Sequence, residues 1–144
     1  MTNNIVLQCL TETHNEFWEN GKDVGLQTKS SSRITKVWQE KLSLIDVKRF
    51  IPEYKVGGYK IDLVDMQEGV AYELKVSPKN PHHEFYRDVF KIVYANSLNR
   101  RFDKFVFCCP AVSVAKLGAL AVFVKSLSKQ LNLHIEIFQI QPKQ

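Results

Sequence analysis

Apolar side chains recur every three or four positions in two segments near the start of the chain. Residues 3–19 and 33–45 both show this spacing, which predicts two amphipathic helices. Ser32 is the expected N-cap of the second helix, because its hydroxyl can accept a hydrogen bond from the first turn. The polar segment 21–32 between them is expected to be a loop.

The middle of the chain changes to short apolar runs of the kind that form strands. The pattern predicts three strands, at 46–56, 59–66 and 70–76. Gly57 and Gly58 give a hairpin turn signal between the first two. Pro52 places the first strand at an edge or a bulge, since proline cannot donate to a central ladder.

Helices and strands alternate in the rest of the chain. The expected elements are a helix at 81–98, a strand at 104–110, a helix at 111–129 and a strand at 134–140. Asn80 as N-cap and Pro81 at the first helical position mark where the third helix begins. The predicted order is α-α-β-β-β-α-β-α-β in one domain, residues 1–144. This order predicts an α/β fold with a central mixed sheet of about five strands flanked by helices.

Composition limits the class of protein. A chain of 144 residues with 44% hydrophobic residues can form one domain with a core, and its net charge of +5 suits a polyanionic partner. Three cysteines, without a CxxC pair, indicate reduced thiols in a cytoplasmic protein rather than disulfides or a zinc site. The apolar segment 111–124 is too short to span a membrane.

Two acids and a base lie inside the predicted hairpin at 59–76. If facing residues have numbers that sum to 135, Asp62 lies opposite Glu73, and Lys75 shares the face of Glu73. Two carboxylates at that separation repel each other unless a cation lies between them, and Mg²⁺ prefers such oxygen ligands. The alternative is an ordinary cross-strand ion pair between Asp62 and Lys75 on a solvated face.

Asp62, followed by Glu73-Leu74-Lys75, resembles the PD-(D/E)XK nuclease superfamily, which has a restriction-endonuclease-like fold. The resemblance covers residues 32–109, more than half of the chain, although Ile61 replaces the proline of the motif's name. It implies that Asp62 and Glu73 bind Mg²⁺, with Mn²⁺ as a substitute, and that the Leu74 carbonyl can be a further ligand. It also implies that Lys75 is the catalytic lysine.

Many members of this superfamily add an acid from the preceding helix. Glu40 is the matching candidate in this chain, and Glu12 and Glu16 compete with it for that role. The alternative for Glu40 is a surface pair with Lys36, four residues earlier in the same predicted helix.

Basic residues near the motif are candidates for contact with nucleic acid. Arg87 and Lys91 are four residues apart on the predicted helix 81–98, and Lys60 and His83 lie near the motif in sequence. The alternative for the helix residues is a solvated face with ion pairs such as Asp88–Lys91.

The expected function is that of a Mg²⁺-dependent DNA endonuclease of restriction or recombination/repair type. We expect a homodimer, no small-molecule cofactor and no membrane association. Small residues in helix 111–129 belong first to the core and second to a dimer face. Two alternatives stay open: a non-catalytic module of the same fold that binds nucleic acid or a protein partner, and an RNA-cleaving member.

Overall fold

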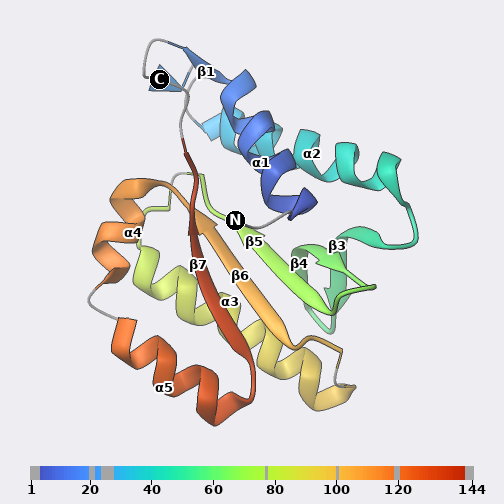
Figure 1. The fold of residues 1–144 in the computed structure, drawn as a ribbon, viewed down its shortest axis with the longest axis vertical. Coiled ribbons are helices and arrows are strands. Elements are labelled where there is room, and N and C mark those ends of the chain that lie inside the picture. The colour runs from blue at the N-terminus through green and yellow to red at the C-terminus, as the bar shows by residue number, and fades with distance from the viewer. Residues whose placement is uncertain are drawn as a thin grey trace.

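The computed structural model describes residues 4–19, 22–23, 28–76, 78–99, 101–118 and 121–141. The helices, shown in Figure 1, are α1 (Ile5–Glu16), α2 (Thr28–Ile45), α3 (Pro81–Leu98), α4 (Ala111–Leu117) and α5 (Ala121–Leu131). The strands are β1 (Trp18–Glu19), β2 (Lys22–Asp23), β3 (Phe50–Val56), β4 (Tyr59–Asp65), β5 (Val70–Leu74), β6 (Lys104–Cys109) and β7 (His134–Gln139).

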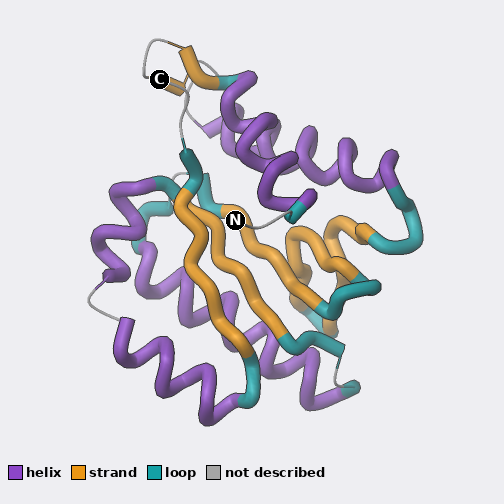
Figure 2. The backbone as a smooth tube through the Cα atoms, viewed as in Figure 1, coloured by secondary structure: helices purple, strands orange, loops and turns teal. Residues whose placement is uncertain are grey.

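A five-stranded mixed sheet in the order β3-β4-β5-β6-β7 forms the centre of the fold. Strands β3, β4 and β5 are antiparallel neighbours joined by short turns. Strands β5, β6 and β7 are parallel, because α3 and then α4 and α5 carry the chain back between them. Helices flank this sheet (Figure 2), so the predicted α/β class and mixed sheet are confirmed.

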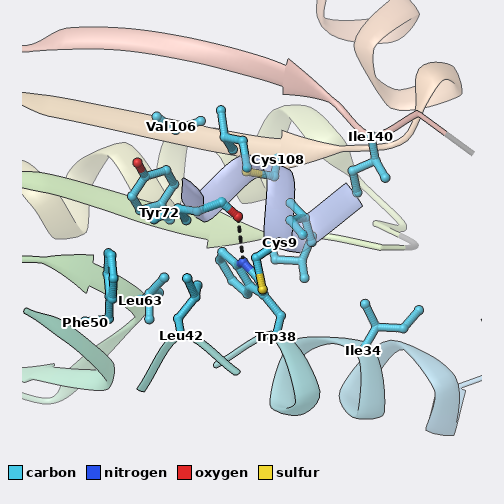
Figure 3. Close-up of a cluster of buried hydrophobic side chains, with 14 of the residues drawn as sticks. Cys9, Ile34, Trp38, Leu42, Phe50, Leu63, Tyr72, Val106, Cys108 and Ile140 are labelled. Carbon is cyan, nitrogen blue, oxygen red and sulfur yellow. Dashed lines mark hydrogen bonds between the residues drawn. The ribbon is translucent and has the colours of Figure 1, made fainter. Parts of the chain in front are cut away.

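Helices α1 and α2 pack on one face of the sheet. Their apolar side chains meet those of the strands in one cluster, in which Trp38, Leu42 and Phe50 are almost completely buried. The indole of Trp38 donates a hydrogen bond of 3.1 Å to the Val6 carbonyl, drawn as the dashed line in Figure 3. This bond ties α2 to α1, so both helices are positioned together over the sheet.

Helices α3, α4 and α5 contribute to a second apolar cluster, formed with the other side chains of the strands. Phe85 of α3 packs edge-to-face on Phe107 of β6, with ring centroids 5.3 Å apart. Because both faces are covered, β5 and β6 read as continuous apolar runs with few polar positions. Glu73 is therefore a conspicuous exception within β5.

Several predicted boundaries differ from the structure. Helix α2 begins at Thr28, so Ser32 lies inside the helix and is not its N-cap. Strand β3 begins at Phe50 rather than at 46, because Asp46 opens a turn in which its side chain accepts hydrogen bonds from two following amides. The predicted helix 111–129 is two helices, α4 and α5. Asn80 does cap α3, accepting from the His83 amide at 3.2 Å.

The three cysteines are free and buried, as predicted. In the described part of the chain, no single helix is long and apolar enough to cross a membrane, and only the bent pair of α4 and α5 passes that test when the two are counted together.

Candidate functional site

Strand β3 is irregular at Glu53. The side chains of Ile51 and Tyr54 pack against the same apolar cluster, although regular alternation would send them to opposite faces. Glu53 lies between them with φ of +50°, a left-handed conformation that is rare for a residue other than glycine. The flanking pairs with β4 keep one register, so Glu53 faces Asp62 across the two strands.

Strand β4 is irregular at the matching position. Ile61 and Leu63 are two residues apart but belong to opposite core clusters, so the alternation breaks at Asp62. Within the described sheet, the pairs between β4 and β5 run from Asp65–Val70 to Leu63–Tyr72 and go no further. These partners have numbers that sum to 135, which confirms the predicted register.

Where the backbone pairing of β4 with β5 stops, two side-chain carboxylates accept hydrogen bonds from the backbone amides. The Leu74 amide donates to Asp62 Oδ2 at 2.8 Å, and the Asp62 amide donates to Glu73 Oε2 at 3.3 Å. The side chains of Asp62 and Glu73 thus accept from amides that would otherwise bond to carbonyl groups across the strands. This exchange fixes both acids at the point where β4 and β5 separate.

Both acids are held where charge is costly. Burial raises the pKa of Glu73 well above its usual value, repulsion by Asp62 and Asp88 raises it further, and attraction to Lys91 opposes these effects. Burial also raises the pKa of Asp62, against the lowering effect of the hydrogen bond from Leu74. A cation placed near the two carboxylates would stabilise their charged forms.

Lys91, from α3, already lies beside Glu73. Its ammonium group is 2.8 Å from Glu73 Oε2, 2.8 Å from the Lys60 carbonyl and 3.2 Å from Asp88 Oδ1. Burial alone would lower the pKa of Lys91, but the two carboxylates outweigh it and leave that pKa raised. Lys91 is therefore a charged, buried part of the site. The sequence had instead suggested that it contacts phosphate at the surface.

Lys75 lies directly after β5 and contacts two acids. Its ammonium is 3.8 Å from Glu73 Oε1 and 3.3 Å from Asp88 Oδ2, and its side chain is 16% exposed. Among the ion pairs of the described residues, Lys75 pairs with these two acids and not with Asp62. The cross-strand Asp62–Lys75 pair considered from the sequence is therefore not the arrangement found.

A cleft of about 570 Å³ opens over Asp62 and Lys75. Its walls come from α2, from Glu53 in β3 and from the segments after β5 and at the start of α3. Gln39 of α2 donates to Glu53 Oε2 at 3.0 Å and to the Asp62 carbonyl at 2.6 Å. It therefore fastens α2 to the two irregular strand positions at the cleft.

The acid expected from the first helices is not in this cleft. Glu40 is exposed and lines a neighbouring hollow with Pro52 and Glu53, so it is not brought together with Asp62 and Glu73. Glu16 forms a surface ion pair with Lys41 at 2.7 Å, and Glu12 is exposed. Glu53 and the amide of Gln39 occupy the place in which Glu40 was expected.

The other predicted contacts for nucleic acid lie outside the buried site. Lys60 and His83 are exposed, and Arg87 has a side chain that is 48% exposed, 3.6 Å from Asp88. The predicted Asp88–Lys91 ion pair is present, but it is buried rather than solvated.

Sequence reasoning missed Glu53, Gln39 and the site role of Asp88. The place of Glu53 at the cleft depends on its left-handed backbone conformation, which no pattern of residues in the sequence predicts. Asp88 did carry a signal, because it precedes Lys91 by three positions on the helix face that packs against the sheet.

Within the described residues, no group of three or more histidine, cysteine or acidic side chains is arranged to hold a metal ion. Asp62, Glu73 and the Leu74 carbonyl are the oxygen groups that the resemblance names as candidate ligands. Comparisons with protein-family models, curated proteins and solved structures found no match for this chain.

Proposed function

We propose that this chain is a metal-dependent nuclease that hydrolyses DNA phosphodiester bonds and has a restriction-endonuclease-like core. One observation carries the proposal: Asp62 and Glu73 fill the gap where β4 and β5 separate, with Lys75 on the side of Glu73. The order of α2, β3, β4, β5, α3 and β6 agrees with the core that the motif implies.

The oxygen groups of this site are suited to bind Mg²⁺. Glu73 Oε1 is buried and has no hydrogen-bond partner among the described residues, although Oε2 is bonded to Lys91. Asp62 uses Oδ2 for the Leu74 amide and lines the open cleft. Carboxylate and carbonyl oxygens are the ligands that Mg²⁺ prefers. When bound, the ion polarises the phosphate and lowers the pKa of a bound water.

The chain's own groups supply the remaining chemistry. Lys75 lines the cleft and its side chain is 16% exposed, so its ammonium can donate to a phosphate oxygen or orient a water molecule. Gln39 holds the Asp62 backbone in place and so limits movement of that acid. The buried Lys91 offsets part of the negative charge that Glu73 and Asp88 bring into the core.

The overall charge of the chain, which is +5, suits a polyanionic substrate. The cleft itself is lined by charges of both signs, with Lys36 and Lys75 among them and three acids, Glu53, Asp62 and Glu84. Arg87, Lys60 and His83 are accessible candidates for additional phosphate contacts. These groups contact backbone phosphates rather than base edges, so they support binding without defining a recognition sequence. We propose DNA as the substrate, and cleavage of RNA is the outcome that would change this assignment.

A homodimer is the remaining part of the proposal. Exposed apolar side chains on α4 and α5, at Val112, Val122 and Phe123, are available for contact with a second copy. Analytical ultracentrifugation over a range of concentrations would test this, and a monomer at all concentrations would refute it.

A non-catalytic module that binds nucleic acid is the second candidate. The Lys91–Glu73 contact of 2.8 Å favours it, because this ammonium already compensates one of the acids that a metal would need. Such a module would bind DNA with or without a divalent cation and would not cut it.

The deciding experiment is a cleavage assay with supercoiled plasmid, linear duplex, branched duplex and RNA, in EDTA, Mg²⁺ or Mn²⁺. We expect wild-type protein to cut DNA only with a divalent cation. Asp62→Ala and Lys75→Ala should each lower the rate by about 10²–10³-fold, because each removes a group that stabilises charge in the transition state.

Matched controls are Glu68→Gln and Lys48→Ala, which remove an acid and a base at exposed turn positions. They should cut as the wild type does. Binding of DNA without cutting in any cation would favour the binding module. Equal cutting by wild type and Asp62→Ala would point to a contaminating nuclease and would reject the proposed site.

A further inference from the structure

We propose that Asp88 is a positioning residue that holds Lys75 in place and keeps its ammonium away from Glu73 Oε1. This inference rests on the proposed function and extends it to a residue outside the motif. Asp88 lies in α3, is completely buried, and does not line the cleft. Its link to the cleft runs through Lys75, and it also contacts Lys91 and Arg87.

The buried carboxylate of Asp88 destabilises the fold unless its charge is compensated. Neither of its carboxylate oxygens has a hydrogen-bond partner among the described residues. Its contacts are ionic, at 3.2 Å to Lys91, 3.3 Å to Lys75 and 3.6 Å to Arg87. A buried carboxylate costs free energy unless cations compensate it. Lys75 and Lys91 provide that compensation, so they are the groups that allow Asp88 to be buried.

The two lysines have different capacities for a ligand. Lys91 donates two hydrogen bonds of 2.8 Å, to the Lys60 carbonyl and to Glu73 Oε2, and forms an ion pair of 3.2 Å with Asp88 Oδ1. These three close contacts leave the ammonium of Lys91 little capacity for a further ligand. Lys75 has longer contacts, at 3.3 and 3.8 Å, and reaches the cleft. Lys75 is the lysine with donors to spare, and its long, flexible side chain needs an anchor to stay in one position.

Asp88 is the nearer of the two acids that form ion pairs with Lys75 in the described part of the chain. Without that charge, Glu73 Oε1 would be the remaining anionic contact of Lys75, and the ammonium would move towards it. That oxygen has no hydrogen bond in the described structure and is the one Lys91 leaves available. Asp88 thus separates the lysine from the oxygen that the proposed metal needs.

The test is a double-mutant cycle in the cleavage assay, with Asp88→Asn, Lys75→Ala and the double variant. Asp88→Asn is nearly isosteric and should lower kcat by about 10- to 100-fold, the usual effect of losing a group that orients a catalytic one. KM for DNA should stay within about twofold. In the Lys75→Ala background, Asp88→Asn should lower kcat much less than it does in the wild-type background, because the proposed effect of Asp88 on the cleft runs through Lys75.

Two further variants guard against a merely structural effect. Asp88→Glu keeps the charge and should recover part of kcat, and Asp88→Ser is a second neutral variant that should match Asp88→Asn. Thermal unfolding identifies any variant that does not fold. Multiplicative losses in the double variant, or a wild-type kcat in Asp88→Asn, would overturn the proposal.

A crystal structure of Asp88→Asn without nucleic acid gives a readout that does not depend on activity. Lys75 Nζ should lie closer to Glu73 Oε1 than the present 3.8 Å. An unchanged position would overturn the positioning role. A wild-type protein that cuts no substrate would instead reject the proposed function, and the crystal structure would still decide what Asp88 does to Lys75.

Discussion

Replacing Lys91 with methionine should strongly destabilise the protein. Lys91 is 8% exposed and sits between Glu73 and Asp88, which are 1% and 0% exposed. Lys91→Met keeps most of the volume but leaves two buried carboxylates short of a cation. Removal of one partner from a buried ion pair costs about 3–5 kcal/mol.

This loss is large enough to measure in two ways. Urea unfolding followed by tryptophan fluorescence should show a free energy of unfolding lower by about 3–5 kcal/mol. The thermal midpoint should fall by about 10 °C, since each 1 kcal/mol shifts it by roughly 2–4 °C in a domain near this size.

A matched control is Lys104→Met, which breaks an ion pair of 3.2 Å with Glu136 whose side chains are 31% and 35% exposed. Exposed pairs contribute only about 0–1 kcal/mol, so this variant should unfold almost as the wild type does. A loss below about 1 kcal/mol for Lys91→Met, or equal losses for the two variants, would refute the reasoning that Lys91 compensates buried charge.

Three other predictions concern pH, backbone and thiols. Burial, followed by repulsion from neighbouring acids, raises the folded-state pKa of Glu73 above its unfolded value of 4.5. The contribution of Glu73 to the free energy of unfolding is therefore fully present below pH 4.5 and is lost as pH rises through the raised pKa. Urea midpoints measured against pH in EDTA should show this decline, and Glu73→Gln should flatten it; an unchanged slope would contradict the assignment. Gly69→Ala should cost about 1–3 kcal/mol, because φ is +68° and a Cβ would lie 2.9 Å from a backbone oxygen, whereas Gly58→Ala meets open space and should be neutral in calorimetry. Burial raises the pKa of Cys109 to about 12 and that of Cys108 well above its usual value, so thiol reagents at neutral pH should label neither until urea is added.

The hairpin was the most predictable part of the fold. The turn signals and the apolar runs predicted the two strands, and the register assumed between them is the one found in the three pairs of β4 with β5. The predicted strand 70–76 ends earlier than expected, at Leu74, and the Lys75 amide donates to the Cys108 carbonyl of β6. Local pattern could not reveal this, since it depends on a parallel neighbour that is distant in sequence.

The candidate site was predictable only where its residues share one hairpin. Asp62, Glu73 and Lys75 lie within 14 residues of one another, so a single hairpin keeps them close in space. Glu40 was named because the resemblance implies an acid from the preceding helix, and helical spacing alone does not tell which side of that helix faces the sheet. In the structure the preceding residue, Gln39, donates to the Asp62 carbonyl, and Glu40 is exposed.

The irregular strand β3 also affects how the molecule behaves at high concentration. It is an edge of the sheet, and an edge invites another chain to extend it. Pro52 has no amide hydrogen to offer, and the left-handed Glu53 bends the strand where an incoming strand would need straight backbone. The same distortion that shapes the cleft therefore discourages polymerisation through this edge, and leaves β7 as the side of the sheet more open to fibre-like growth.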